Sequence, residues 1–265
     1  MISIVKVTLT NATIRQLVAN VHFSAHLSKV KNQFPPMNND QDHLDYITKL
    51  LESKSAAKQT TYKHLLASFS MLSKEAKRII TELKKRAHPT DKDVTIEFRE
   101  INEHEFHVKL AGDLLIFVLH TNIVTFADSH QIMQDPYMKE EEVNRYFGQI
   151  NIYNFMSDSL KFNRVNDPGY LLARLMINHH NRFFIEGEGQ LSTLFSKISE
   201  KPIEHEALQA LVKIALAIAI ENDLVAMPYP DVKFITLYQK LEHTPDMGGG
   251  QKIGFQMSYV DKTKA

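Results

Sequence analysis

The apolar pattern of the chain changes its period at Asp93, and this change limits the fold more than any other feature of the sequence. Before Asp93, apolar residues recur every three or four positions, which is typical of amphipathic helices. After it, Val94, Ile96 and Phe98 alternate with polar residues, as in a strand that buries one face. Helices followed by a run of strands predict an α+β fold.

Residues 1–90 are expected to form a helical N-terminal region. Its apolar stripes at helical spacing lie at residues 14–25, 44–51, 62–69 and 76–83. Ser73 is a suitable N-cap for the last of these helices, and Pro89 ends it.

Residues 91–265 are expected to form an α+β region. Short polar links such as Asn102-Glu103 and Gly112-Asp113 join the apolar runs, and links this short connect antiparallel strands. We therefore predict a mostly antiparallel meander over residues 94–188, with a hairpin turn at residues 178–181. Further elements are predicted as helices at 137–146 and 190–199, a buried helix at 203–223 that packs on the sheet, and a C-terminal hairpin of 232–239 and 251–260.

Composition excludes several classes of site. The chain has no cysteine, which rules out disulfides, thiol nucleophiles and cysteine-ligated zinc or iron–sulfur sites. Lys plus Arg and Asp plus Glu number 31 each, so the net charge gives no support for nucleic-acid binding, although a local basic groove is not ruled out. The N-terminus lacks a signal-peptide core, and no segment has the about 20 apolar residues of a bilayer span. We expect a cytoplasmic protein that does not enter a membrane.

Histidine pairs suggest metal binding. His22 and His26 lie four positions apart on a predicted helix, a spacing that can place two imidazoles on one metal ion. Phe23 follows His22 where a zinc-protease helix has glutamate, and the sequence indicates no third ligand. The adjacent His179 and His180 are expected to diverge unless their turn redirects them, and we predict that they are solvated turn residues.

Asp128-Ser129-His130 contains the three residue types of a serine-hydrolase triad. A triad is assembled from side chains that meet in space, and contiguous residues fan out along the chain. We therefore expect Asp128 or Ser129 to cap a helix.

The most specific chemical hypothesis concerns Asp167, Glu186 and Glu188. Two carboxylates on adjoining strands can hold Mg²⁺ or Mn²⁺, which activates water for phosphodiester hydrolysis. An acidic residue before one strand and Phe-Ile-Glu-Gly-Glu on the next resemble the core of the PD-(D/E)xK nuclease superfamily. The resemblance implies that Asp167 and Glu186 are metal ligands in a catalytic site. Glu188 stands where the family has lysine, and Asp167 precedes proline where the family has the reverse order.

No motif identifies an activity, because the chain has no nucleophile elbow, phosphate-binding loop or dinucleotide fingerprint. The leading hypothesis is a non-catalytic binding or scaffold module that contacts a protein partner or itself, as an oligomer and without a cofactor. The alternative is a divergent metal-dependent nuclease or phosphodiesterase that uses Mg²⁺ or Mn²⁺. Single-stranded nucleic-acid binding through Tyr170, Arg174 and Arg182 is a third class.

Overall fold

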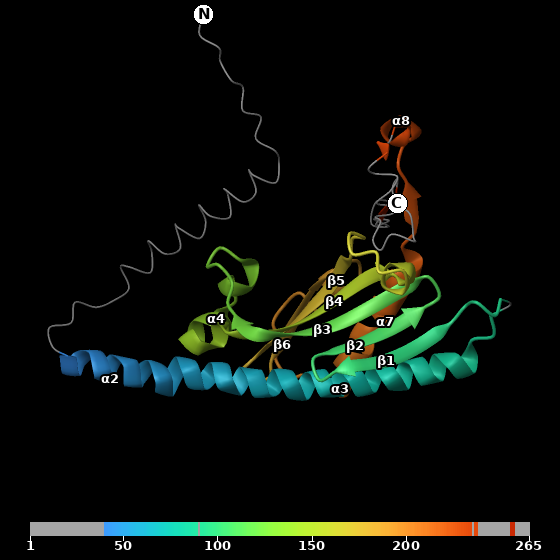
Figure 1. Ribbon diagram of the computed structural model, residues 1–265. Coiled ribbons are helices and arrows are strands. Elements are labelled where there is room, and N and C mark those ends of the chain that lie inside the picture. The colour runs from blue at the N-terminus through green and yellow to red at the C-terminus, as the bar shows by residue number, and fades with distance from the viewer. Residues whose placement is uncertain (1–39, 90, 235, 238–254, 258–265) are drawn as a thin grey trace, which may run out of the picture. The chain divides into compact units, whose positions relative to one another are not determined.

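The computed structural model describes residues 40–89, 91–234, 236–237 and 255–257 (Figure 1). The chain divides into two compact units, residues 1–52 and 53–265. In the first unit, the described part is the helix α2 (Asp40–Leu50) and the start of the π-helical segment η1 (Leu51–Ser55). The helix predicted at residues 14–25 lies outside the described residues.

A six-stranded antiparallel sheet forms the centre of the second unit and confirms the predicted α+β class. Each strand pairs with the next along the chain, so the sheet is a meander. The strands are β1 (Ile96–Asn102), β2 (Glu105–Leu110), β3 (Asp113–Val124), β4 (Phe147–Met156), β5 (Tyr170–Asn178) and β6 (Phe183–Gly187).

One long helix, α3 (Ala56–Arg86), packs against the sheet. The helix start predicted at Ser73 is wrong, because α3 continues through this residue without a break. Its buried apolar positions keep their three- and four-residue spacing across Ser73, so that the helix presents one continuous face to the core. These positions are Leu65, Phe69, Leu72, Ala76, Ile79 and Ile80.

A second helix, α7 (His205–Glu221), lies beside α3 and also contacts β3 and β5 (Figure 1). It occupies most of the segment 203–223 that was predicted to be a helix. Apolar side chains of α3, α7 and one face of the sheet form the main hydrophobic cluster. Gly148 of β4 lets Leu65 of α3 approach the sheet closely.

The opposite face of the sheet carries a smaller hydrophobic cluster, because Phe147, Met176 and Phe184 alternate along their strands with residues of the main one. The segment between β3 and β4 covers them with Ile132, Met133, Tyr137 and Met138. This segment contains η2 (Gln131–Gln134), α4 (Pro136–Glu140) and η3 (Glu142–Arg145). The single helix predicted at 137–146 is therefore wrong, since extended backbone at Glu141 separates α4 from η3.

The remaining elements are short. They are α5 (Ser157–Lys161), α6 (Leu191–Leu194), β7 (Leu224–Ala226), α8 (Tyr229–Val232) and β8 (Phe255–Met257). β7 pairs with β8, and α6 covers only four residues of the helix predicted at 190–199. Much of the predicted hairpin of 232–239 and 251–260 lies outside the described residues. Within the described ranges, no helix has the length and apolar character needed to cross a bilayer.

Candidate metal centre

The turn between β5 and β6 presents two adjacent histidines in a fixed conformation. The side-chain oxygen of Asn178 accepts hydrogen bonds from the backbone N–H groups of His180 and Arg182, at 3.1 and 3.0 Å. Asn181 has a φ of 59°, the left-handed conformation that asparagine tolerates in turns. The turn redirects His179 and His180 toward each other, so that their ring centroids lie 4.0 Å apart.

Glu141, at the end of α4, completes a group of three ligands. One nitrogen from each histidine and one carboxylate oxygen of Glu141 lie within 4.8 Å of one another. Ligands bound to Zn²⁺ lie about 2.1 Å from the ion and hence no more than about 4.2 Å from each other. Glu141 is exposed, so rotation of its side chain can bring the carboxylate closer to the two histidines.

His179 has an unsatisfied nitrogen. Its Nδ1 atom is buried and has no hydrogen-bond partner among the described residues. Burial, and then the neighbouring His180, lower the pKa of His179. The ring is therefore neutral near pH 7, and neutral imidazole is the form that binds metal ions.

Tyr137 holds the ring of His180. Its hydroxyl oxygen lies 2.8 Å from Nδ1 of His180 and accepts a hydrogen bond, also 2.8 Å long, from the side-chain amide of Asn178. The guanidinium of Arg182 lies 4.2 Å from the centre of the Tyr137 ring. Burial raises the pKa of Tyr137, so the phenol stays protonated at neutral pH. When Nδ1 of His180 carries its proton toward Tyr137, Nε2 has a free lone pair for an ion.

The donor set selects the kind of ion. Two imidazoles and one carboxylate are typical ligands of Zn²⁺ and related first-row transition metals. Mg²⁺ and Ca²⁺ prefer sites made of oxygen ligands, so this group suits them poorly.

The structure gives Asp167 and Glu186 separate partners. Glu186 accepts hydrogen bonds from Nε of Arg174 and, at 2.9 Å, from Nε2 of His130. Asp167 is buried and accepts a 2.6 Å hydrogen bond from the hydroxyl of Ser159.

The strand register shows how these carboxylates are arranged along the sheet. Glu186 lies opposite Arg174, four positions and about 13 Å along β5 from Tyr170, where the strand begins. Asp167 precedes that first residue. Glu188 lies beyond the end of β6, where its backbone N–H donates to the carbonyl oxygen of Leu172. His22 and His26 lie outside the described residues.

Asp128 and His130, which the sequence places beside Ser129, bind different partners. Asp128 forms a 2.6 Å salt bridge with Arg145. His130 is the N-cap of η2, since its Nδ1 accepts a hydrogen bond from the backbone N–H of Ile132. The cap predicted at Asp128 or Ser129 is thus one or two residues too early.

Sequence reasoning missed Tyr137 and Glu141 as site residues. The sequence signal for this place was the asparagine-flanked His179-His180 turn, but both histidines were interpreted as diverging, solvated turn residues and not as ligands. In comparisons with protein-family models, with curated proteins and with solved structures, the chain matches none of them.

Proposed function

We propose that the protein is a binding module for a divalent transition-metal ion of the zinc type, held by Glu141, His179 and His180. The observation that carries this proposal is the convergence of one ligand atom from each of the three residues to within 4.8 Å, and the buried Nδ1 of His179, which has no hydrogen-bond partner in the described part of the chain, supports it. Three protein ligands leave at least one position of a tetrahedral ion for water or for a group from a bound molecule.

The surroundings support an ion at this place. Tyr137 belongs to the smaller hydrophobic cluster, so the support of His180 is anchored in a packed part of the fold. His179 and His180 are fixed by a turn whose own backbone hydrogen bonds are made by Asn178. A site held by packed neighbours binds an ion with less loss of side-chain freedom.

Calorimetric titration with Zn²⁺ at near-neutral pH tests the proposal on the full chain without an affinity tag. We expect one equivalent of Zn²⁺ to bind. His179→Ala, His180→Ala and Glu141→Gln should each weaken the Zn²⁺ affinity by more than about 100-fold, which is more than the loss expected when a residue that only orients a ligand is removed. His88→Ala is the matched control, because His88 is exposed and lies outside the cluster. Equal binding by all four variants would refute the proposed site.

A second candidate function is self-association, which develops the scaffold hypothesis. The segment 224–237 exposes a run of large apolar side chains: Leu224, Val225, Tyr229, Phe234 and Leu237. Large apolar side chains that are exposed to solvent favour a protein contact. Light scattering after gel filtration should show a dimer or larger oligomer that Phe234→Ser with Leu237→Ser converts to monomer. A monomeric wild type would remove the support for this function.

A further inference from the structure

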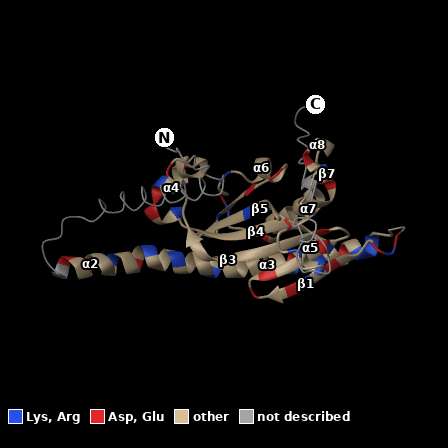
Figure 2. Cartoon of the chain, turned by 45° about the horizontal axis from the view of Figure 1, so that its top comes forward, with Lys and Arg blue, Asp and Glu red and all other residues tan. Residues whose placement is uncertain are grey.

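The helix α3 concentrates positive charge in a chain whose net charge is zero. It contains eight lysine and arginine residues and two glutamates, an excess of six positive charges. Seven of the eight cations are exposed, and only Lys58 is half-buried. Figure 2 shows the blue segments along this helix.

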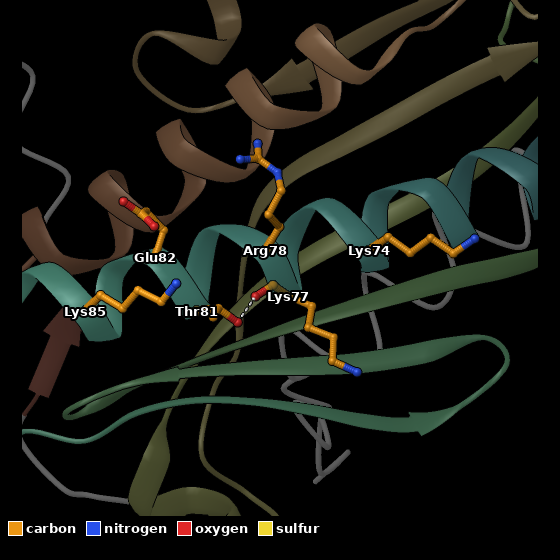
Figure 3. Close-up of a pocket in the computed structure, with 6 residues that line it drawn as sticks. All are labelled: Lys74, Lys77, Arg78, Thr81, Glu82 and Lys85. Atoms are coloured by element: carbon orange, nitrogen blue, oxygen red, sulfur yellow. Dashed lines mark hydrogen bonds between the residues drawn. The ribbon is translucent and has the colours of Figure 1, made fainter.

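Five of these cations form a stripe on the exposed side of α3. We call Lys63, Lys74, Lys77, Arg78 and Lys85 the basic stripe; their spacings of about three, four, seven and eleven residues return to one side of a helix. The stripe is about 33 Å long at about 1.5 Å per residue. Its C-terminal part lines a shallow groove together with Thr81 and Glu82 (Figure 3).

The two glutamates of α3 leave most of this charge uncompensated. Glu75 binds Arg78 and His205, and Glu82 binds Arg86. In the described part of the chain, Lys63, Lys74, Lys77 and Lys85 have no carboxylate within the 4.0 Å of a salt bridge. Four like charges held in a row on one helix attract a polyanion.

The chemistry of the stripe distinguishes between the kinds of polyanion. A helix that binds a membrane surface inserts apolar side chains, and protein interfaces are centred on apolar or aromatic anchors. The exposed large apolar residue of α3 is Leu66, which is 36% exposed, and its other large apolar side chains are turned into the fold. Single-stranded nucleic acids require exposed aromatic rings for base stacking, whereas Phe69 of α3 is buried and Tyr62 is half-buried and packs against the main hydrophobic cluster. A straight row of cations without such anchors fits the phosphates of a duplex.

We propose that the basic stripe of α3 binds the phosphate backbone of double-stranded nucleic acid without reading its sequence. Its length of about 33 Å is close to one helical turn of a duplex, about 34 Å. Each lysine that contacts a phosphate releases a condensed counterion, so binding must weaken steeply as salt is raised.

Fluorescence anisotropy with a labelled mixed-sequence DNA duplex of about 20 base pairs tests the proposal. Titrations between about 50 and 200 mM NaCl give the salt slope, and EDTA in every buffer separates this result from metal binding. The test variant is Lys74→Gln with Lys77→Gln and Lys85→Gln. The control variant carries the same change at three exposed lysines elsewhere, Lys161, Lys197 and Lys201. Circular dichroism checks that both variants fold.

The stripe variant is expected to lose affinity at least about tenfold, with a salt slope shallower by about 0.9 for each lost contact, while the control keeps the wild-type affinity and slope. Three results would overturn the proposal. They are no binding by the wild type at low salt, an equal loss in both variants, and binding of phosphatidylserine vesicles without binding of the duplex.

Discussion

The phenolic oxygen of Tyr137 and Nδ1 of His180 lie 2.8 Å apart, which ties the candidate metal centre to the packed interior of the fold. Tyr137 is only 6% exposed, and the side chain of Asn178 donates a second hydrogen bond to the same oxygen. His180 is exposed, so without this bond its ring would rotate freely in the turn. The position of one ligand is thus set by a residue 43 positions earlier in the chain.

Tyr137→Phe should weaken Zn²⁺ binding by about 10- to 100-fold, because it removes the group that orients His180 and keeps the ring that packs in the cluster. It should also lower the free energy of unfolding by about 1 to 3 kcal/mol, since the amide of Asn178 loses a buried acceptor. Calorimetry and urea unfolding measure the two effects.

Tyr153→Phe is the control for this substitution. The hydroxyl of Tyr153 accepts a 3.2 Å hydrogen bond from the side-chain amide of Asn151, and Tyr153 is not part of the His179-His180 turn. Its Zn²⁺ affinity should equal that of the wild type. Equal Zn²⁺ affinities for Tyr137→Phe and the wild type would show that Tyr137 has a structural role alone.

Glu75 connects the two helices that cover the sheet. Burial alone would raise the pKa of Glu75, but hydrogen bonds from His205 of α7 and from Arg78 outweigh it and lower the pKa. A lowered carboxylate pKa stabilises the fold above the unfolded-state pKa of about 4.3, and this contribution is lost as pH falls through the folded value. Glu75→Gln should therefore cost about 1 to 2 kcal/mol near pH 7 and progressively less below about pH 4.

Urea unfolding of wild type and Glu75→Gln at several pH values checks this dependence. Glu82→Gln is the matched control on the same helix, because Glu82 and Arg86 form an exposed pair and such pairs add little. A difference between wild type and Glu75→Gln that stays the same from pH 7 to acid would contradict the assignment.

Gly148 marks a close approach of α3 to the sheet. A methyl group there would lie 2.9 Å from Cδ2 of Leu65 and 3.0 Å from its Cβ, which moves only with the helix backbone. Gly148→Ala should lower the free energy of unfolding by about 1 to 3 kcal/mol. Gly112→Ala, where a methyl group meets nothing within 4 Å, should change it by less than about 0.5 kcal/mol. Equal effects of the two substitutions would argue against this packing.

Glu186→Gln tests the nuclease hypothesis directly. Both carboxylate oxygens of Glu186 already bind protein groups, His130 and Arg174. We therefore expect any rise in unfolding temperature with Mn²⁺ to be the same in wild type and variant, as measured by differential scanning fluorimetry. A rise that disappears in Glu186→Gln would instead support a metal site at Asp167 and Glu186.

The fold class was predictable from the sequence because it depends on periodicity. The alternation of Val94, Ile96 and Phe98 and the short links after them are enough to indicate an antiparallel meander. The break expected at Ser73 failed because capping preference is local, whereas the apolar face of α3 is buried continuously against the sheet.

The candidate site was not predicted from the sequence. The two turn histidines are visible in the sequence, but their convergence depends on the left-handed backbone at Asn181. Glu141 and Tyr137 reach the turn because the segment between β3 and β4 packs on Phe147, Met176 and Phe184, a tertiary contact with no periodic signal. Asp167 and Glu186 are the opposite case, because they were selected from a sequence motif. In the structure Asp167 binds Ser159, whereas Glu186 binds His130.

Anomalous diffraction at the zinc absorption edge, from crystals of the Zn²⁺-bound protein, tests whether Glu141, His179 and His180 hold the ion. We expect one strong peak at about 2.0 to 2.2 Å from a nitrogen of His179, a nitrogen of His180 and a carboxylate oxygen of Glu141. Zinc peaks at other residues, with none at this turn, would contradict this assignment.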